Sequence, residues 1–566
     1  ELCHAQTCGK CVPCRIGLGQ LNNFIREVLD GKATMKTLDI MEQTALSIME
    51  SADCAIGYEA ANMVYKGLIG YRDDYIEHIQ NGRCTCTYNQ PVPCVSLCPA
   101  HVDIPGYIAL VGEGRYADAI RLLRKDNPFP TTCGFICEHP CEARCRRNMV
   151  DDSINIRGLK RVAADFAGEV DPPQCAPSTG KKIAILGGGP GGLSAAYYLQ
   201  LMGHQTTVYE MLPELGGMLR YGIPNYRLPK ERLDDDIRAI LKTGVQVKNG
   251  LKIGQDITIQ ELRQQYDVVL ITIGASTDKK LGLENEDADG IISAVQFLRN
   301  VGKNQIIDLT GKEVVVIGGG NVSMDAVRTA KRLGAKKVSI VYRRRVADMT
   351  ALPGEIEGAV AEGIELQTLK APASIDVDEN HHVKGIYVTP QMVSSIRDGR
   401  ASIKPTGEED IYIPCDVLIV AIGQNIETHH FEQAGIPVER GKIITKSTGA
   451  FENLPGVFAG GDCASGPASV IKAIAAAKVV AANIDEYLGY HHEISCDVEI
   501  PKASLHDRVP CGRAELTERE ACERVCDFEG VENCMTEKEA KQEACRCLRC
   551  DHFGYGIFKG GREKLW

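Results

Sequence analysis

Apolar positions follow two different patterns along this chain. Residues 21–29 and 35–49 carry apolar side chains every three or four positions, which is the spacing of an amphipathic helix. Residues 106–125 and 468–488 are also predicted to be helical. Between residues 180 and 424, short apolar runs of strand type alternate with helical stretches, and the whole pattern occurs twice. The sequence therefore predicts an α/β fold with two Rossmann-like units, preceded by helical domains.

Each predicted α/β unit opens with a glycine-rich turn after an apolar run. The first turn lies in KKIAILGGGPGG (181–192) and leads to Glu210 at the end of the next strand. The second lies in KEVVVIGGGNVS (312–323) and leads to Arg343 in IVYRRR. A carboxylate at this place accepts hydrogen bonds from an unmodified ribose, whereas an arginine favours a 2′-phosphate. We therefore expect two dinucleotides, one with a bare ribose and one like NADP(H).

The first turn has the glycines that a dinucleotide site requires. Gly187 permits the tight bend, Gly189 lets the backbone approach a pyrophosphate, and Gly192 lets helix and strand pack closely. Asp462 follows a short apolar strand and precedes a helix, which suits a carboxylate bonded to a flavin hydroxyl. Three alternatives stay open: a non-binding glycine turn, Asp462 as a helix N-cap, and the arginine run 343–345 as a solvated face.

Length and charge narrow the class of protein. The 566 residues have room for about three to five domains. The net charge of −11 argues against a nucleic-acid surface. No apolar run approaches the roughly 20 residues that cross a bilayer, and no signal peptide is visible, so we expect a cytoplasmic protein. The chain begins at Glu1 close to a motif, and we expect it to be part of a longer polypeptide.

The 24 cysteines are concentrated at the two ends of the chain. Only Cys415, Cys463 and Cys496 lie between Gly180 and Cys511. Tight C-x2-C and C-x3-C spacings favour metal over disulfides in a large nucleotide-binding chain. Iron–sulfur clusters are the leading interpretation because flavin chemistry needs an electron outlet, and zinc is the alternative. The isolated cysteines are predicted to be small core residues, namely Cys3, Cys175, Cys415, Cys463 and Cys496.

Several motifs together identify a family resemblance over residues 83–490. GGGPGG with Glu210, YGIPNYRLPK (221–230), GGGNVSMD, YRRR and AGGD resemble the small subunit of NADPH-dependent glutamate synthase. They are similar also to its relatives in electron-bifurcating transhydrogenases and dihydropyrimidine dehydrogenase. The resemblance implies a glutathione-reductase-like pair of domains with FAD on the first unit and NADPH on the second. Hydride then passes between the cofactors, and no protein acid or base is required.

The resemblance also implies which residues hold the two nucleotides. The predicted FAD residues are Gly187, Gly189, Pro190, Gly191, Gly192, Glu210, Gly217, Arg220, Gly274, Gly461 and Asp462. The predicted NADP(H) residues are Gly318, Gly320, Asn321, Val322, Ser323, Arg343, Arg344 and Gly423.

The family places two 4Fe-4S clusters in its N-terminal helical domain. By resemblance, the first cluster uses Cys84, Cys86, Cys94 and Cys145, and the second uses Cys98, Cys137 and Cys141. Two departures from the family pattern bear on these ligands. The opening is C-x-C-x7-C in place of C-x2-C-x4-C, and Lys160 and Arg161 stand where some relatives have a Glu or Gln ligand. Cys133 is the substitute that we expect as the fourth ligand of the second cluster.

The N-terminal segment resembles a different module. TCGKCVPCRIG followed by Cys54 in SADCAIG looks like the 4Fe-4S domain of the NADH-binding subunit of respiratory complex I. The implied ligands of this third cluster are Cys8, Cys11, Cys14 and Cys54. In the tail, a further cluster on Cys522, Cys526, Cys534 and Cys550 competes with a zinc site or free thiols.

These motifs divide the chain into five expected parts. They are a complex-I-like 4Fe-4S domain (1–82), a helical domain with two clusters (83–178), an FAD domain (179–310 with 425–490), an NADP(H) domain (311–424) and a cysteine-rich tail (491–566).

The sequence favours an electron-transfer flavoprotein subunit that links NADP(H), FAD and 4Fe-4S clusters. The complex-I-like module predicts partners resembling the NADH dehydrogenase subunits of complex I, with ferredoxin as a further partner, as in a bifurcating transhydrogenase. Three alternatives stay open: a glutamate synthase small subunit, an NADPH reductase linked to formate dehydrogenase, hydrogenase or a metal acceptor, and a non-enzymatic cluster scaffold.

Overall fold

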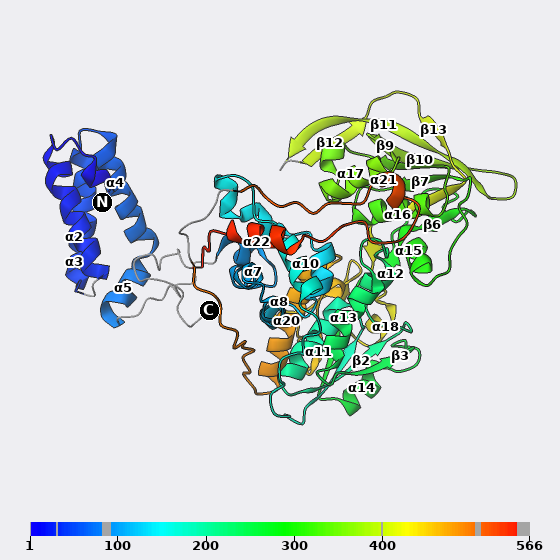
Figure 1. The fold of residues 1–566 in the computed structure, drawn as a ribbon, viewed down its shortest axis with the longest axis horizontal. Coiled ribbons are helices and arrows are strands. Elements are labelled where there is room, and N and C mark those ends of the chain that lie inside the picture. The colour runs from blue at the N-terminus through cyan, green and yellow to red at the C-terminus, as the bar shows by residue number, and fades with distance from the viewer. Residues whose placement is uncertain (1, 30–31, 82–91, 398–399, 504–510, 552–566) are drawn as a thin grey trace. The chain divides into compact units, whose positions relative to one another are not determined.

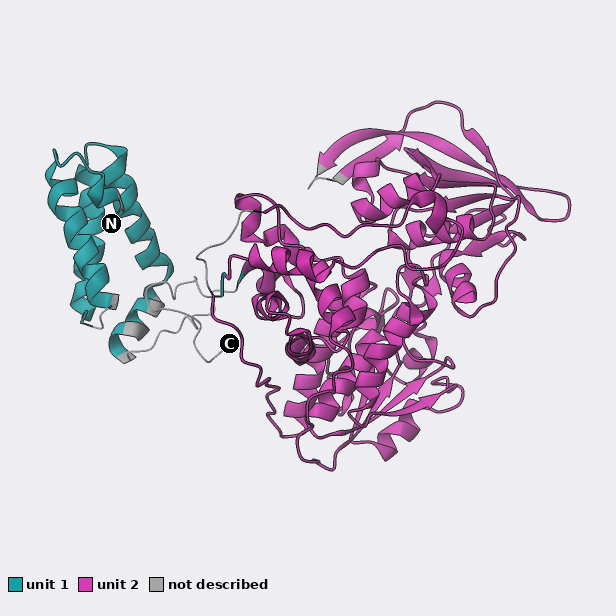
Figure 2. Cartoon of the chain, viewed as in Figure 1, with its two compact units in different colours: residues 1–92, 550–566 teal, residues 93–549 magenta. Residues whose placement is uncertain are grey.

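The computed structural model describes residues 2–29, 32–81, 92–397, 400–503 and 511–551. The chain divides into two compact units, residues 1–92 with 550–566 and residues 93–549 (Figure 2). Within the described residues, no helix is long and apolar enough to cross a membrane.

The first unit is helical. Leu38 and Met41 are fully buried in its core, and the Thr34 hydroxyl caps the third helix by accepting a hydrogen bond from the Thr37 amide at 3.3 Å. The helices predicted at 21–29 and 35–49 are confirmed. The elements of this unit are α1 (Leu2–Ala5), η1 (Pro13–Gly17), α2 (Leu18–Leu29), α3 (Met35–Ser51), α4 (Ala55–Gly70) and α5 (Arg72–Asn81) (Figure 1).

The second unit begins with short helices, and six of its cysteines lie on or between them. The stretch 106–125, predicted as one helical segment, is two helices that end and begin around Gly114. Gly114 has φ +74°, and the Arg115 amide donates to the Leu110 carbonyl at 2.9 Å, which is a Schellman-type helix end. The elements are α6 (Pro93–Leu97), α7 (Ile104–Gly112), α8 (Tyr116–Asp126), α9 (Pro130–Ile136), η2 (Pro140–Arg144), η3 (Arg146–Met149) and α10 (Ile156–Phe166).

The first sheet has five parallel strands in the order β18-β4-β1-β2-β3. Its outer strand β18 comes from the C-terminal segment, so the chain returns to this sheet after completing the second one. The strands are β1 (Lys182–Leu186), β2 (Gln205–Glu210), β3 (Gln246–Asn249), β4 (Val268–Ile271) and β18 (Val457–Ala459). The helices around it are α11 (Pro190–Leu201), α12 (Met218–Tyr221), α13 (Lys230–Leu241), α14 (Ile259–Gln265), α18 (His429–Gln433), α19 (Asp462–Ser465) and α20 (Val470–Tyr487).

The second sheet repeats this topology in the order β6-β14-β7-β8-β9, which confirms the predicted duplication of the α/β unit. Its outer strand β6 lies before residue 311, unlike β18 of the first sheet. The strands are β6 (Ile291–Ser293), β7 (Glu313–Ile317), β8 (Lys337–Tyr342), β9 (Glu365–Thr368) and β14 (Val417–Val420). The helices are α15 (Ala294–Gly302), α16 (Asn321–Arg332), η4 (Val346–Asp348) and α17 (Pro353–Ala361).

An antiparallel sheet is inserted between β9 and β14, where β11 pairs with β10, β12 and β13. The tail then adds two short helices. These remaining elements are β10 (Lys370–Val377), β11 (Val383–Arg397), β12 (Arg400–Pro405), β13 (Ile411–Pro414), the pairs β5 (Thr277–Asp278) with β15 (Gln424–Asn425) and β16 (Val438–Glu439) with β17 (Lys442–Ile443), and the helices α21 (Ala521–Arg524) and α22 (Glu537–Cys545).

One hydrophobic core joins the cysteine-bearing helices to the first sheet. It runs without interruption from Tyr107 and Leu159 of those helices to Ile183 of β1 and Leu193 of α11. Burial of apolar area at about 25 cal/mol per Å² makes such a shared core the main force that fixes these parts together. The cysteine helices are therefore packed as part of the body that carries the first sheet.

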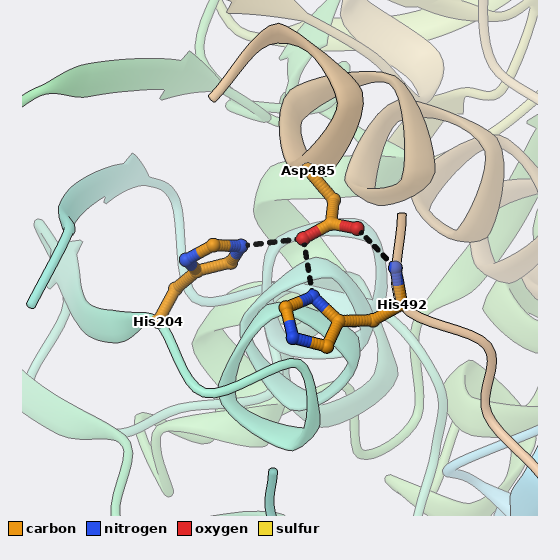
Figure 3. A group of neighbouring side chains, drawn as sticks. All are labelled: His204, Asp485 and His492. Carbon is orange, nitrogen blue, oxygen red and sulfur yellow. Dashed lines mark hydrogen bonds and ion pairs between the residues drawn. The ribbon is translucent and has the colours of Figure 1, made fainter. Parts of the chain in front are cut away.

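A buried carboxylate clasp closes the end of α20 onto the first sheet. His204 Nε2 and His492 Nδ1 both lie 2.8 Å from Asp485 Oδ1, and the His492 amide donates to Asp485 Oδ2 at 2.7 Å (Figure 3). His204 is fully buried just before β2, so the clasp ties the chain that follows α20 to the sheet interior. Burial alone would raise the pKa of Asp485, but its hydrogen bonds with His492 and His204 lower it overall.

Asp485→Asn tests this clasp. The change removes the shared charged acceptor of two histidines, and we expect the free energy of unfolding to fall by about 1–3 kcal/mol at pH 7. Because the pKa of Asp485 is lowered on folding, the difference from wild type should be full above about pH 4 and shrink as the pH falls through the folded pKa. Urea unfolding of the variant and the wild type at pH 7 and at a pH below the folded pKa of Asp485 measures this difference. Glu493→Gln, at an exposed site, is the control. If the difference in the free energy of unfolding between variant and wild type does not change with pH, the Asp485 carboxylate does not stabilise the fold in this way.

Candidate nucleotide clefts and cysteine clusters

The first cleft opens where β1 meets α11. Gly187 has φ +108°, and a Cβ there would lie 2.6 Å from the Thr272 carbonyl oxygen. A Cβ on Gly192 would lie only 1.9 Å from the Gly187 carbonyl oxygen, so this helix start requires glycine. Gly217, with φ +53°, faces the turn so closely that its Cβ would lie 2.8 Å from the Gly189 Cα. At these glycines the turn leaves bare backbone beside the N-terminus of α11, where anions are favoured.

Two carboxylates face this cleft from opposite strands. Glu210 ends β2 and accepts hydrogen bonds from the Gly188 amide at 2.7 Å and the Leu212 amide at 2.8 Å. Burial raises the pKa of Glu210, although these amides oppose the shift. Burial also raises the pKa of Asp462 to about 6. The N-cap position of α19 is Gly461, so Asp462 is the first helical residue; it lines the cleft, and its carboxylate accepts a backbone hydrogen bond at Ala468.

Most, but not all, of the predicted first-site residues line the cleft. Gly192 lies buried beneath the turn, and the Arg220 guanidinium is held by Asp234 and by the Leu215 carbonyl at 2.6 Å. Arg299 of α15 lines the cleft without having been predicted; its Nε is buried and has no hydrogen-bond partner among the described residues. The predicted residues in the lining are Gly187, Gly189, Pro190, Gly191, Glu210, Gly217, Gly274, Gly461 and Asp462.

The second cleft has a volume of about 750 Å³ and lies at the corresponding place on the second sheet. A Cβ on Gly318 would lie 2.4 Å from the Ala421 carbonyl oxygen, and one on Gly319 would lie 2.6 Å from the Tyr342 ring. The predicted residues in its lining are Gly318, Gly320, Asn321, Val322, Arg343, Arg344 and Gly423, whereas Ser323 is buried beneath the turn.

The three arginines after β8 have different roles. Arg345 is bound to Asp348 through two bonds of 2.8 and 2.9 Å, which lower the pKa of that carboxyl, and it does not line the cleft. Arg344 Nε donates to the Ala401 carbonyl at 3.0 Å. Arg343 is exposed at the cleft and forms no hydrogen bond or ion pair with any described residue. Arg343 therefore has its guanidinium available for an anionic ligand.

Asn321 connects the second cleft to a cysteine-bearing loop. Its Oδ1 accepts from the Leu352 amide and its Nδ2 donates to Glu138 Oε1, both at 3.0 Å. Glu138 directly follows Cys137, so the second nucleotide-type turn and this loop touch within one unit.

In the first unit, the four predicted cluster ligands interact with one another. The pKa of Cys14 is raised to about 11, first by burial and then by the thiols of Cys11, Cys54 and Cys8. The pKa of Cys11 is lowered by backbone hydrogen bonds at Cys14 and Asp53. Such amide donors stabilise a thiolate, which is the form that binds metal.

In the second unit, four buried cysteines gather around one lysine. Cys98, Cys133, Cys137 and Cys141 are each no more than 6% exposed. Burial alone would lower the pKa of Lys160, but these four thiols raise it overall. Cys133, the predicted substitute ligand, therefore lies with the other three.

The remaining predicted ligands are only partly described. Cys84 and Cys86 lie outside the described residues. Cys94 lies in α6 and Cys145 directly follows η2, and these two elements pack together. Burial raises the pKa of Tyr107, and the thiols of Cys141 and Cys94 raise it further. In the tail, Cys522 and Cys526 are exposed on and after α21. Cys534 lies against Asp165 of α10, and no hydrogen bond joins it to either of them in the described chain.

Thiol spacing bears on the kind of metal. Four thiolates at 2.3 Å from one zinc ion would be about 3.8 Å apart. Among the described residues, the only His, Cys, Asp or Glu group with three ligand atoms within 4.8 Å of one another is His204, Asp485 and His492, and it contains no cysteine. All described cysteines are free thiols.

One part of the cysteine interpretation is wrong. Cys415 and Cys463 are buried core residues as predicted, but Cys175 is exposed, and Cys3 and Cys496 are only half-buried. The physical reason at Cys175 is that the proline-rich segment 171–177 forms neither helix nor strand and runs over the surface.

Three carboxylates that no motif predicted position the cysteine helices. Buried Asp236 of α13 accepts from the Thr131 and Thr132 amides at 3.2 and 2.7 Å and so caps α9. Buried Glu543 of α22 accepts from the Asn155 amide at 2.8 Å, directly before α10. Glu142 of η2 accepts from the Arg157 amide at 3.1 Å. Their partners are 15 to 388 residues away, and no sequence spacing signals such pairs.

Three family models match parts of the chain. Residues 181–477 match the model "Pyridine nucleotide-disulphide oxidoreductase". Residues 70–171 match "Dihydroprymidine dehydrogenase domain II, 4Fe-4S cluster", and residues 1–78 match "NADH-ubiquinone oxidoreductase-F iron-sulfur binding region".

Three curated relatives are similar over most of their own length. The chain is 32% identical to the NADP(+)-dependent formate dehydrogenase subunit beta of Moorella thermoacetica, over 99% of this chain and 90% of the relative. It is 34% identical to the NADPH-Fe(3+) oxidoreductase subunit beta of Geobacter sulfurreducens, over 96% and 88%. It is 34% identical to the glutamate synthase [NADPH] small chain of Escherichia coli, over 70% and 88%. The chain therefore belongs to the pyridine nucleotide-disulphide oxidoreductase family and is an NAD(P)H-dependent flavoprotein oxidoreductase with 4Fe-4S domains.

Proposed function

We propose that this chain is the FAD- and iron–sulfur-containing subunit of an NADPH oxidoreductase. The observation that carries the proposal is the contrast between two equivalent clefts in one unit: Glu210 ends the second strand of one, and Arg343 follows the second strand of the other. We assign FAD to the first cleft and NADP(H) to the second. When bound, a flavin accepts a hydride and can release electrons singly, as 4Fe-4S clusters require.

The chain's own groups would act by placement and charge. In the first cleft, the bare backbone at the start of α11 faces a pyrophosphate, and Glu210 accepts from ribose hydroxyls. In the second, the start of α16 faces the phosphates, and Arg343 pairs with the 2′-phosphate through a charge-assisted contact. Asp462 and Arg299 would bind the flavin nucleotide from the far wall of the first cleft. No side chain has to move a proton.

The extent of the relatives favours one acceptor class. The formate dehydrogenase and Fe(3+) oxidoreductase subunits match nearly the whole chain, including its N-terminal module, whereas the glutamate synthase small chain matches 70% of it. We therefore propose a reductase subunit that exchanges electrons with a formate-dehydrogenase-like or metal-reducing partner. Transhydrogenation, electron bifurcation and a ferredoxin partner stay predictions.

The cluster count is part of the proposal. We assign 4Fe-4S clusters to Cys8, Cys11, Cys14 and Cys54, to Cys98, Cys133, Cys137 and Cys141, and to Cys94 and Cys145 with Cys84 and Cys86. The complex-I-like match of residues 1–78 supports a partner resembling the flavoprotein subunits of complex I. A further cluster on Cys522, Cys526, Cys534 and Cys550 stays a prediction, because Cys534 faces Asp165 and the first two are exposed.

Anaerobic mixing with NADPH tests the proposed activity. We expect the absorbance bands of the oxidised flavin in the full chain to bleach when NADPH is added. Hydride transfer requires only that NADPH and FAD occupy their two clefts. NADH at the same concentration serves as the comparison. A flavin that stays oxidised with NADPH, yet is bleached by dithionite, contradicts the proposal.

Arg343→Glu tests the nucleotide assignment. Arg343 is the unengaged cation of the second cleft, so charge reversal should weaken NADPH binding at least about tenfold more than NADH binding, about 1.4 kcal/mol. Anaerobic titration of each nucleotide measures the two dissociation constants. Arg440→Glu makes the same charge change on a side chain that is 92% exposed and should affect neither. Equal weakening of both nucleotides would overturn the assignment.

Cys54→Ala tests the cluster of the first unit. Cys54 interacts with Cys14 among the four gathered thiols, and its loss should remove one cluster's iron and sulfide while the flavin content stays at the wild-type level. Iron, sulfide and flavin analysis of the anaerobically purified protein measures this. Cys3→Ala, in the same unit but outside the set, is the control. Unchanged iron in Cys54→Ala would defeat the ligand assignment.

A further inference from the structure

We propose that Lys160 is a charge-compensating residue that raises the reduction potential of the cluster assigned to Cys98, Cys133, Cys137 and Cys141. The inference rests on the proposed function, because it requires that these thiols hold a cluster. It concerns a residue that takes no part in binding either nucleotide.

Lys160 lies in the middle of α10 with only 5% of its surface exposed. Helix α10 packs along α9, which carries Cys133 and ends immediately before Cys137. All four cysteines of the set are buried to a similar degree. Of the groups around Lys160, these four thiols contribute most to favouring its charged form. Lys160 is thus a central cation within a set of thiols.

Lys160 differs from the neighbouring basic residues of α10, which are paired with carboxylates. Arg161 is paired with Asp165 at 2.5 Å, and Arg157 donates to Glu532 at 2.5 and 2.9 Å. Lys160 forms no hydrogen bond or ion pair with any described residue. Taking an unpaired ammonium out of water is strongly unfavourable, and an opposite charge beside it offsets that cost.

The compensating charge has to come from the thiols. Neutral thiols are weak donors and acceptors that would leave the ammonium uncompensated. Thiolates bound to an iron–sulfur core carry net negative charge, and cluster potentials depend on the net charge around them. A fixed positive charge favours the added electron more than the oxidised state, so Lys160 should make this cluster easier to reduce.

The position of these four thiols explains why a raised reduction potential would matter for electron transfer. The first amides of α9 are held by Asp236 of α13, a helix of the domain that carries the first cleft. The loop after Cys137 contacts Asn321 of the second cleft through Glu138. The cluster that Lys160 faces is therefore the one whose ligand-bearing segments touch both nucleotide domains, where an easily reduced acceptor would draw electrons from the flavin.

The test compares Lys160→Met, which keeps the length and removes the charge, with Lys160→Arg, which keeps the charge. EPR-monitored redox titration of the full chain gives the midpoint potential of each cluster, and iron and sulfide analysis gives their number. In Lys160→Met we expect one midpoint to fall by at least about 59 mV, a tenfold loss in the equilibrium constant for one-electron reduction. Lys160→Arg should stay near wild type, as should Lys541→Met, an exposed lysine on α22.

Each outcome decides the matter. Full iron with an unchanged potential in Lys160→Met overturns the inference. Loss of one cluster in Lys160→Met but not in Lys160→Arg supports it, because charge is then required for the cluster to be held. Loss in both variants overturns it, since shape and not charge would be needed. If iron analysis of the wild-type chain shows that this cluster is missing, the proposed function is refuted. That result is distinct from a failure of the Lys160 inference.

Discussion

The arrangement of the second unit depends on buried carboxylates that bind the backbone amides of cysteine-bearing segments. Asp236 caps α9 from α13, Glu543 holds the start of α10 from the tail, and Glu142 joins η2 to α10. Leaving such amides unpaired in a dry core costs about 1–3 kcal/mol each. Asp236 belongs to α13 of the first-sheet domain, so its bonds hold α9 against that domain, while Glu543 and Glu142 hold the start of α10 to the tail and to η2. The tail, which its sequence marks only by its cysteines, holds the start of α10 through Glu543.

The two nucleotide clefts show how one topology serves two ligands. Both place a glycine turn at the start of a helix after the first strand, and both exclude side chains there by contacts that a Cβ would violate. They differ at the end of the second strand. Glu210 is buried and bonded to the turn itself, whereas Arg343 is exposed at a wider cleft with its guanidinium unengaged. The two clefts therefore differ in the charge, the exposure and the hydrogen bonding of the residue at this position.

Sequence reasoning found what depends on local steric or spacing rules. Gly187 and Gly192 were predictable because a turn before a helix requires them, and Cys8, Cys11 and Cys14 because their spacing is a metal pattern. It could not find Asp236, Arg299 or Glu543, since each acts on a segment far away in the chain. Of the arginine run, Arg343 and Arg344 line the second cleft, whereas Arg345 is paired with Asp348 outside the lining, a pairing that sequence position does not reveal. The sequence of the inserted antiparallel sheet contains no motif from which the sheet could be predicted.

We propose that electrons from NADPH reach the clusters through this chain alone. Low-temperature EPR of the anaerobic full chain, frozen after addition of NADPH, tests this path. We expect signals of reduced 4Fe-4S clusters to appear with NADPH as the sole reductant. Clusters that stay EPR-silent with NADPH while the flavin is reduced, yet give their signals with dithionite, would contradict it.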